Sequence, residues 1–247
     1  MSEWWTYRPS DFLMFSPRAY WRLFELANEA SWPLQLVLIA VGVGWSIRRW
    51  RPPDADDSSS SAARFGAAYL AVAWAWVAWV FLQQRYAAIN WAAGWFAMAF
   101  VVQASAFAAL AVFGGLRLVP RGRRRLAGLA LTAWALLGQP LLGAALGRPW
   151  TQLEVIGVAP DPTMIAALGY LTIVRGEGRP AALRRCLWIV PLLGCAVSAA
   201  TLWTMGSAQA WVLPLAVAVA TWAVWQPDWR PDQRLDSRPD PPADRQS

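Results

Sequence analysis

The feature that most limits what this chain can fold into is a series of long apolar segments that carry no charge. Seven of them follow one another, at residues 32–47, 65–81, 91–113, 126–146, 162–174, 186–205 and 211–225. Of the 247 residues only 15 % are charged, against about 25 % in an ordinary soluble domain. Segments of this kind are typical of transmembrane helices, so we predict an all-α, polytopic transmembrane helix bundle.

The lengths of the segments leave the number of spans open between six and seven. A straight span needs about 20 residues, which the third, fourth and sixth segments meet and the second nearly meets. The first is shorter, but Leu23, Phe24, Leu26 and Ala27 continue a helical apolar pattern upstream of it. The fifth, at 162–174, could instead be a re-entrant or interfacial segment, which would leave six spans.

The distribution of arginine favours seven spans. The chain has no lysine, so all 22 basic residues are arginines. Most of them gather after the first, third, fifth and seventh segments, whereas Arg85 alone follows the second, Arg148 alone follows the fourth, and none follows the sixth. Basic loops are retained in the cytoplasm. The alternation requires the fifth segment to cross, and it predicts an outside amino terminus and a cytoplasmic carboxyl terminus. The assignment has one cost, since the amino-terminal segment with Arg8, Arg18 and Arg22 must then lie outside.

The flanking segments complete the predicted organisation. Residues 1–31 form an extracytoplasmic, interfacial segment in which Ser16 caps an amphipathic helix that begins at Pro17. Residues 32–225 form the transmembrane domain, and residues 226–247 a disordered cytoplasmic tail rich in proline, aspartate and arginine. Many of the 19 tryptophans fall at span ends, as expected of residues that prefer the headgroup layer.

Several kinds of chemistry are excluded by the composition. Without histidine there is no imidazole ligand or base, and without lysine there is no retinal Schiff base. Cys186 and Cys195 would lie about 13 Å apart along one helix, too far for a disulfide. The clustered arginines flank membrane segments and do not form a nucleic-acid-binding face. We therefore predict no catalytic residue, no metal site, no cofactor and no nucleic-acid partner, and we expect that the chain is not an enzyme.

Unusual polar residues gather in the segments that are predicted to lie outside. Together they form a candidate outer-facing polar site of Arg8, Asp11, Arg85, Asn90, Glu154 and Asp161. Asp161 is expected first of all to cap the fifth helix, with Pro162 as its first residue, and ligand binding is the alternative. The spans themselves carry almost no charge, which argues against ion-coupled transport.

Three of these outer segments carry a resemblance to a known family. The stretches WWTYRPSDFLMFS near the start, RYAAINW at 85–91 and GVAPDPT at 157–163 resemble an uncharacterised bacterial polytopic membrane protein family, domain of unknown function 6064. The similarity runs from about residue 3 to residue 225. It implies a multi-helix bacterial membrane protein, and it implies no activity, substrate or cofactor.

Two functions compete on this evidence. The first is a small-solute permease-like protein, in which spans one to three and five to seven could be parallel repeats. The alternative is an accessory or assembly protein that binds a partner membrane protein or a lipid. A membrane enzyme that uses Arg85, Glu154 and Asp161 ranks third, because their spacing matches no catalytic pattern. The expected partners are the lipid bilayer and either a small solute or another membrane protein.

Overall fold

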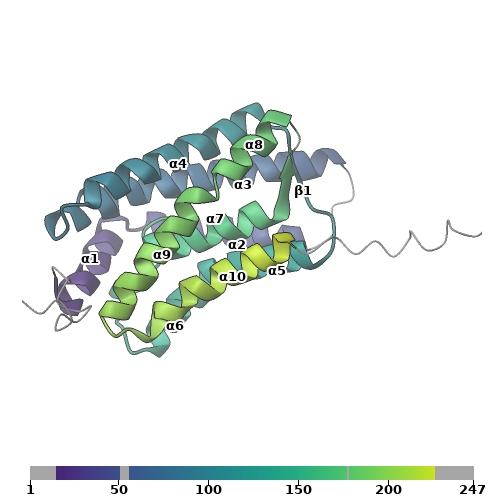
Figure 1. Cartoon of the computed structure of the whole chain (residues 1–247). Helices are drawn as coiled ribbons and strands as arrows, with labels where there is room; N and C mark the ends of the chain where they lie inside the picture. The colour runs from purple at the N-terminus through teal and green to yellow at the C-terminus, as the bar shows by residue number, and fades with distance from the viewer. Residues whose placement is uncertain (1–14, 51–55, 177, 226–247) are drawn as a thin grey trace, which may run out of the picture.

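The computed structural model describes residues 15–50, 56–176 and 178–225, and this part of the chain is helical almost throughout (Figure 1). The helices pack side by side into one elongated bundle, and a short helix lies across one of its ends.

In the first half of the chain, the elements are α1 (Pro17–Ala30), α2 (Leu34–Trp50), α3 (Asp56–Trp76) with its continuation η3 (Val77–Gln83), the 3₁₀ turn η4 (Tyr86–Ala88), and α4 (Ala93–Phe113). The next elements are α5 (Arg123–Ala133) with its continuations η5 (Trp134–Gly138) and α6 (Gln139–Ala145), the 3₁₀ turn η6 (Trp150–Gln152), and α7 (Pro160–Ile173). The last are α8 (Gly178–Cys186) followed by α9 (Ile189–Thr204), the 3₁₀ turn η7 (Ala208–Trp211), and α10 (Val212–Trp225). Two short strands, β1 (Leu116–Leu118) and β2 (Val174–Gly176), pair antiparallel, with Arg117 opposite Arg175.

The described helices include five that are long and apolar enough to cross a membrane. They cover Ser60–Ala88, Ala93–Phe113, Arg123–Ala145, Gly178–Thr204 and Ala208–Trp225. Helices α1 and α2 pass the same test only as a pair bent by 86°, which would be a sixth span. The prediction of a helical protein with several potential spans is thus confirmed. The fifth predicted segment corresponds to α7, whose 14 residues are fewer than a straight span needs.

Helix α7 forms the centre of the bundle. All of its side chains from Asp161 to Ile173 are buried, and it packs against α3, α5, α9 and α10. Its contact with α5 is close enough to need glycine on both helices. A Cβ atom added to Gly128 would lie 2.6 Å from the carbonyl oxygen of Gly169, and one added to Gly169 would lie 2.7 Å from that of Gly128.

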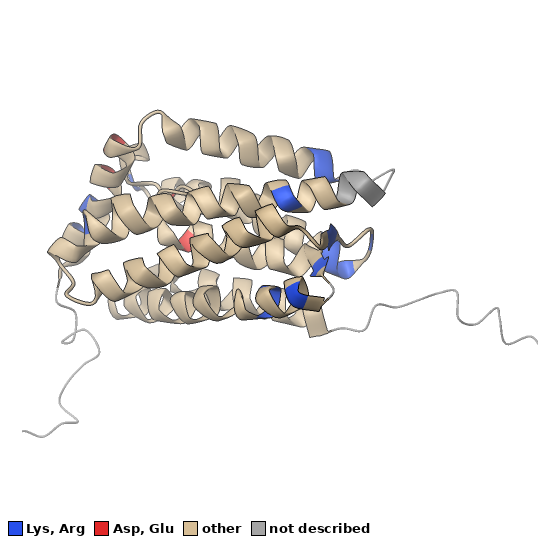
Figure 2. Ribbon diagram, turned by 90° about the horizontal axis from the view of Figure 1, so that it is seen from above, with Lys and Arg blue, Asp and Glu red and all other residues tan. Residues whose placement is uncertain are grey.

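Arginine side chains complete the carboxyl ends of two helices. The Arg124 guanidinium donates to the Thr172 carbonyl at 3.3 and 3.2 Å, and Arg184 donates to the Leu171 carbonyl at 3.2 Å, in the last turn of α7. Arg64 donates to the Ala111 carbonyl of α4 at 2.8 Å. Cationic side chains at this position satisfy free carbonyls and the helix dipole. Most of the arginines gather at this end of the bundle, as Figure 2 shows.

Helix α1 begins as predicted. Ser16 is its cap, since the Ser16 hydroxyl accepts from the backbone N–H of Ala19 at 3.2 Å, and Pro17 is its first residue. The apolar residues Leu23, Phe24 and Ala27 do not lengthen α2, because α1 ends at Ala30 and Pro33 interrupts the chain before α2 begins. They are buried against the bundle, where α1 packs on η3 and η6.

The predicted tryptophan belt corresponds to exposed rings near the ends of the helices. Ten of the described tryptophan side chains are more than half exposed: Trp32, Trp50, Trp79, Trp91, Trp95, Trp150, Trp203, Trp211, Trp222 and Trp225. The predicted disordered tail at 226–247 lies outside the described residues.

Candidate functional site

Two acidic side chains lie deep inside the bundle. Of the acidic side chains that the structure describes, only Glu154 and Asp161 are buried, with exposed fractions of 0 % and 1 %. Glu154 belongs to the segment between α6 and α7, and Asp161 to the first turn of α7. Figure 2 shows an acidic position within the bundle, away from both of its ends. A buried acid of this kind needs a partner that offsets its charge.

The segment that carries Glu154 folds back into the protein. Residues 154–159 are all buried, although they form no regular helix. Asn28 of α1 holds the start of this segment, because its side-chain amide donates to the carbonyls of Thr151 and Leu153, both at 2.9 Å. Further along, the backbone N–H of Gly157 donates to the Thr163 hydroxyl at 2.8 Å. Irregular backbone is tolerated at membrane depth only where protein surrounds it in this way.

Glu154 is paired with an arginine. Its Oε2 accepts from Nη2 of Arg148 at 3.0 Å and from Nε2 of Gln139 at 3.3 Å. Trp134 orients Gln139, since the indole N–H donates to Oε1 of that residue at 3.2 Å. The Arg148 guanidinium also lies over the Trp21 ring of α1, 3.9 Å from its centroid, which is cation–π geometry.

Asp161 is bound to α9 and lies next to Glu154. Its Oδ1 accepts from the Ser198 hydroxyl at 2.6 Å. The Glu154 carboxyl lies close enough to the Asp161 carboxyl for their charges to interact. Oδ2 of Asp161 and Oε1 of Glu154 have no hydrogen-bond partner among the described residues. The cluster therefore contains two carboxyl groups, one guanidinium and two acidic oxygens without a donor.

The expectation that Asp161 caps its helix is wrong. Helix α7 begins at Pro160, and the residue at the cap position is Ala159, which makes no side-chain capping bond. The segment contains two prolines, and Pro160, not Pro162, takes the first turn, where a missing N–H costs nothing. Asp161 is therefore inside the helix, and its side chain is free to reach across to α9.

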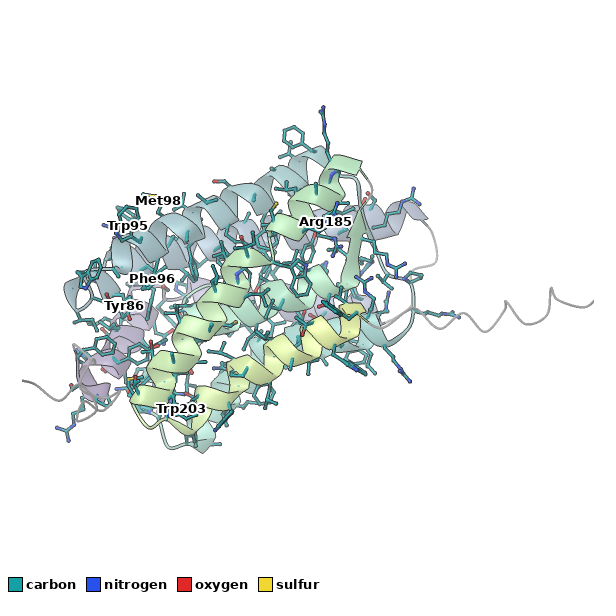
Figure 3. The ribbon with its side chains drawn as sticks, viewed as in Figure 1. Tyr86, Trp95, Phe96, Met98, Arg185 and Trp203 are labelled. Atoms are coloured by element: carbon teal, nitrogen blue, oxygen red, sulfur yellow. The ribbon has the colours of Figure 1, made fainter. Side chains whose placement is uncertain are left out.

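A cavity of about 370 Å³ borders Asp161. Its wall is mainly apolar and includes five aromatic rings, those of Tyr20, Phe81, Tyr86, Phe96 and Phe100. Aliphatic side chains of α7 and α9 complete the wall, and Ser198 and Thr201 place hydroxyl groups on it. In Figure 3 the labelled side chains of Tyr86 and Phe96 lie on the side of α4 that faces α9. Apolar cavities with a few polar groups at one point are typical ligand sites.

Most of the partly exposed residues that line the cavity lie on α4 and α9, so its opening lies between these two helices. On α9, Leu193 and Val197 line it and are 63 % and 45 % exposed. On α4, Phe96 and Ala99 line it and are half-buried. The neighbouring outer surface of α4 is apolar too, with Trp95 and Met98 pointing away from the cavity (Figure 3). The opening therefore lies on a part of the surface that suits lipid chains better than water.

Tyr20 brings α1 into the site. Burial, followed by the negative charges of Asp161 and Glu154, raises the pKa of the Tyr20 phenol well above its ordinary value. The phenol therefore keeps its proton over the whole neutral range and remains a hydrogen-bond donor beside the cavity.

The predicted polar site is only partly assembled. Glu154 and Asp161 lie together. Asn90 is connected to the cavity through Tyr86, because the Asn90 side-chain amide donates to the Tyr86 hydroxyl at 2.8 Å and Tyr86 lines the cavity. Arg85 is half-buried in the same turn but does not line the cavity. Arg8 and Asp11 lie outside the described residues.

Three residues of the site were not predicted from the sequence: Arg148, Ser198 and Tyr20. Arg148 carried a usable signal, because it is the only arginine in its predicted outer loop and stands against the general tendency of arginine to stay inside. Ser198 and Tyr20 gave no comparable signal, since a serine in a span and a tyrosine in an apolar stripe are usually packing residues.

Comparison with known proteins identifies the family of the chain and no function. Residues 17–233 match the model of a family of unknown function, DUF6064. The chain belongs to this family. Neither a curated protein nor a solved structure matches the chain. The DUF6064 match covers every element described above, from α1 to α10, so it includes the acid cluster and the cavity. Within the described residues, no group of three or more acidic or cysteine side chains could hold a metal ion.

The ion pair of Arg148 and Glu154 should be important for stability. Replacing Arg148 with methionine leaves Glu154 buried without its cation, so we expect the free energy of unfolding to fall by about 3–5 kcal/mol. The double variant Arg148→Met, Glu154→Gln removes both charges and should regain most of this loss. Unfolding in detergent, followed by circular dichroism, measures both effects.

Arg22→Met is the matched control, since Arg22 pairs with Glu25 at the surface of α1 and its side chain is 55 % exposed. Exposed pairs contribute about 0.2–1 kcal/mol. A loss in Arg148→Met no larger than in Arg22→Met would contradict the assigned role of the buried pair.

Proposed function

We propose that this chain is a multi-pass membrane protein that binds an amphipathic molecule, such as a lipid, which reaches the cavity from the bilayer between α4 and α9. The proposal is carried by one observation: an apolar cavity with aromatic walls is bordered by α4 and α9, and its polar groups include Asp161 and Ser198, which are hydrogen-bonded to each other. The role is binding, for storage or for transfer to a partner membrane protein, and not catalysis. No cofactor takes part in it.

The shape of the cavity favours an amphipathic ligand over a hydrophilic solute. A hydrophilic solute would lose its hydration on entering a cavity walled by phenylalanine, leucine and valine side chains. The polar side chains of the wall are too few to replace the lost water: Tyr20, Tyr86, Asp161, Ser198 and Thr201. An amphipathic molecule can leave its chain in contact with the apolar wall while its polar end meets Asp161. The cavity wall therefore favours lipid binding over small-solute permeation.

The idea of two parallel three-span repeats receives little support from the helices that would correspond. Helix α2 is at the surface, with Leu36, Val37 and Ile47 more than half exposed, whereas α7 is buried on all sides. Two helices in equivalent positions of a repeat would be expected to have similar surroundings.

Our proposal for the topology keeps seven crossings in a bacterial inner membrane, with the arginine-rich end of the bundle in the cytoplasm. Helix α7 is then a short crossing that the buried segment 154–159 extends towards the outside. The pairing of β1 with β2 supports this, because it puts the carboxyl end of α7 beside the loop between α4 and α5. Arg148 and Arg85 would then lie towards the outer end.

Cysteine accessibility tests the crossing of α7. In a variant whose native cysteines are replaced, Trp150→Cys should react with a membrane-impermeant maleimide added to intact cells, because Trp150 is exposed before the crossing. Arg179→Cys, exposed after it, should react only once the membrane is opened. Equal reactivity of both positions in intact cells would contradict a crossing by α7.

Photolabelling tests the binding site itself. The full chain in maltoside detergent is irradiated with hexanol that carries an aryl diazirine, and the labelled residues are located by mass spectrometry. We expect labels on cavity residues of α4, α7 and α9, among them Phe96, Met164 and Val197. Ala99→Trp, which fills the opening, should reduce this labelling at least fivefold.

Met98→Trp is the matched control, because Met98 directly precedes Ala99 on α4 and is 58 % exposed on the surface away from the cavity. It should leave the labelling unchanged. Labels spread evenly over the apolar surface, or an equal loss in both variants, would count against a ligand site in the cavity.

A further inference from the structure

The cavity combines an acidic oxygen that lacks a partner with a wall of aromatic rings, and we infer that its ligand is an amphipathic molecule whose polar end is an ammonium group. This inference rests on the proposed function, since it names the chemical class of the molecule that occupies the same cavity. It follows from the charge of the cluster, the nature of the wall and the position of the oxygen.

The cluster lacks one positive charge. Arg148 offsets Glu154 through their ion pair of 3.0 Å, and Glu154 adds a like charge within reach of Asp161. Asp161 receives one hydrogen bond, from the neutral Ser198 hydroxyl. Two carboxylates and one guanidinium in a buried place leave a net negative charge, which needs a further cation or a proton.

A cation can approach Asp161 from the cavity, because this residue lines it. Asp161 is 1 % exposed and lines the cavity, and its Oδ2 has no donor among the described residues. An ammonium group in the cavity would offset the charge of this oxygen, and one that carries an N–H would also donate a hydrogen bond to it. Of the described residues that line the cavity, none is basic, so an anionic ligand would find no partner there.

The wall suits a cation with an apolar chain. The rings of Tyr20, Phe81, Phe96 and Tyr86 form a contiguous group, in which Tyr86 has its centroid 6.5 Å from that of Tyr20, 6.2 Å from that of Phe81 and 6.5 Å from that of Phe96. Aromatic faces attract ammonium groups, and more strongly where water is excluded. The aliphatic side chains towards the opening, Leu193 and Val197, fit a hydrocarbon chain that continues into the bilayer.

A proton takes the place of the ammonium group when the cavity is empty. Bound to one of the two acidic oxygens that lack a partner, Oδ2 of Asp161 or Oε1 of Glu154, it would remove the excess charge. Binding of the cation then releases this proton. Rising pH removes the competing proton, so the affinity for a permanently charged ammonium ligand should increase with pH.

Several titratable groups surround Asp161. They are Tyr20 of α1, Tyr86 of η4, Cys195 of α9, and Arg148 and Glu154 before α7. Helix α4 adds only apolar side chains to the cavity wall. Phenols, thiols and guanidinium groups ordinarily hold their protons at neutral pH. The excess negative charge lies on the two carboxyl groups, so we assign the competing proton to the Asp161–Glu154 pair.

Competition with the photoreactive alcohol tests the inference on the full chain in maltoside detergent. The probes are octyltrimethylammonium, whose charge does not change with pH, together with 1-octanol and octanoate. Octyltrimethylammonium should protect the cavity from labelling at a concentration at least tenfold below that of 1-octanol, and octanoate should protect least. In Asp161→Asn the advantage of the cation should disappear, while protection by 1-octanol stays the same.

Glu29→Gln is the matched control, since it removes an exposed acid from α1 and should leave every probe unchanged. Equal protection by octyltrimethylammonium in the wild type and in Asp161→Asn would overturn the inference. If Asp161→Asn does not fold, the wild type still decides, because protection by the cation should strengthen from pH 5 to pH 8 by up to tenfold per unit. Protection that is independent of pH would overturn it too.

Failure of this inference can be told apart from failure of the proposed function. If the photoreactive alcohol labels the cavity but the cation protects no better than 1-octanol, the ammonium inference fails and the binding site stands. If the alcohol does not label the cavity at all, the proposed function fails as well.

The ammonium group can belong to a soluble amine or to a lipid headgroup such as phosphatidylethanolamine. Mass spectrometry of lipids that stay bound during purification distinguishes these sources. Retention of phosphatidylethanolamine by the wild type, and its loss in Asp161→Asn, identifies a lipid. Protection by octyltrimethylammonium without such retention identifies a free amine. Both results support the inference.

Discussion

The structure depends on the burial of one short helix on all of its sides. Because α7 contacts protein in every direction, the free backbone groups at its two ends cannot be left to water or lipid. At the carboxyl end, Arg124 and Arg184 donate to its last carbonyls. At the amino end, the chain folds inward through residues 154–159, and this inward fold brings Glu154 to Asp161. The acid cluster is thus a consequence of how α7 is held.

Helix α1 connects the surface of the bundle with this cluster. Asn28 fixes the segment before Glu154, Trp21 stacks on Arg148, and Tyr20 forms part of the cavity wall. A helix predicted to lie only in the membrane interface is therefore also a part of the site. Any movement of α1 would change the position of Arg148, and so the balance of charge at Asp161.

The general architecture could be predicted from the sequence because it follows from long apolar segments and helix caps, which are local signals. The cap at Ser16 is such a case. The same signals failed at Asp161, because two prolines offered two possible helix starts and only tertiary packing chose between them. The lengths of the segments also gave no sign that α7 is buried while α2 is exposed, since both are equally apolar runs.

The chemistry of the site was harder to predict, for the same reason. Glu154 and Asp161 could be selected as unusual acids in an apolar chain. Their partners Arg148 and Ser198 come from a loop and from α9, and only the fold brings Ser198, 37 residues further on, within 2.6 Å of Asp161. The arginines of the basic loops were interpreted as signals of orientation, and the structure adds their role as caps of α7 and α4.

In our proposal, the buried pair of acids beside the cavity holds one proton until a cation takes its place. Infrared difference spectroscopy of the purified chain at neutral pH measures this most directly. We expect the carbonyl band of a protonated carboxylic acid in the empty protein, its absence in Asp161→Asn, and its loss when octyltrimethylammonium is added. An empty wild-type protein that shows no such band, with both carboxyl groups ionised, would contradict the account.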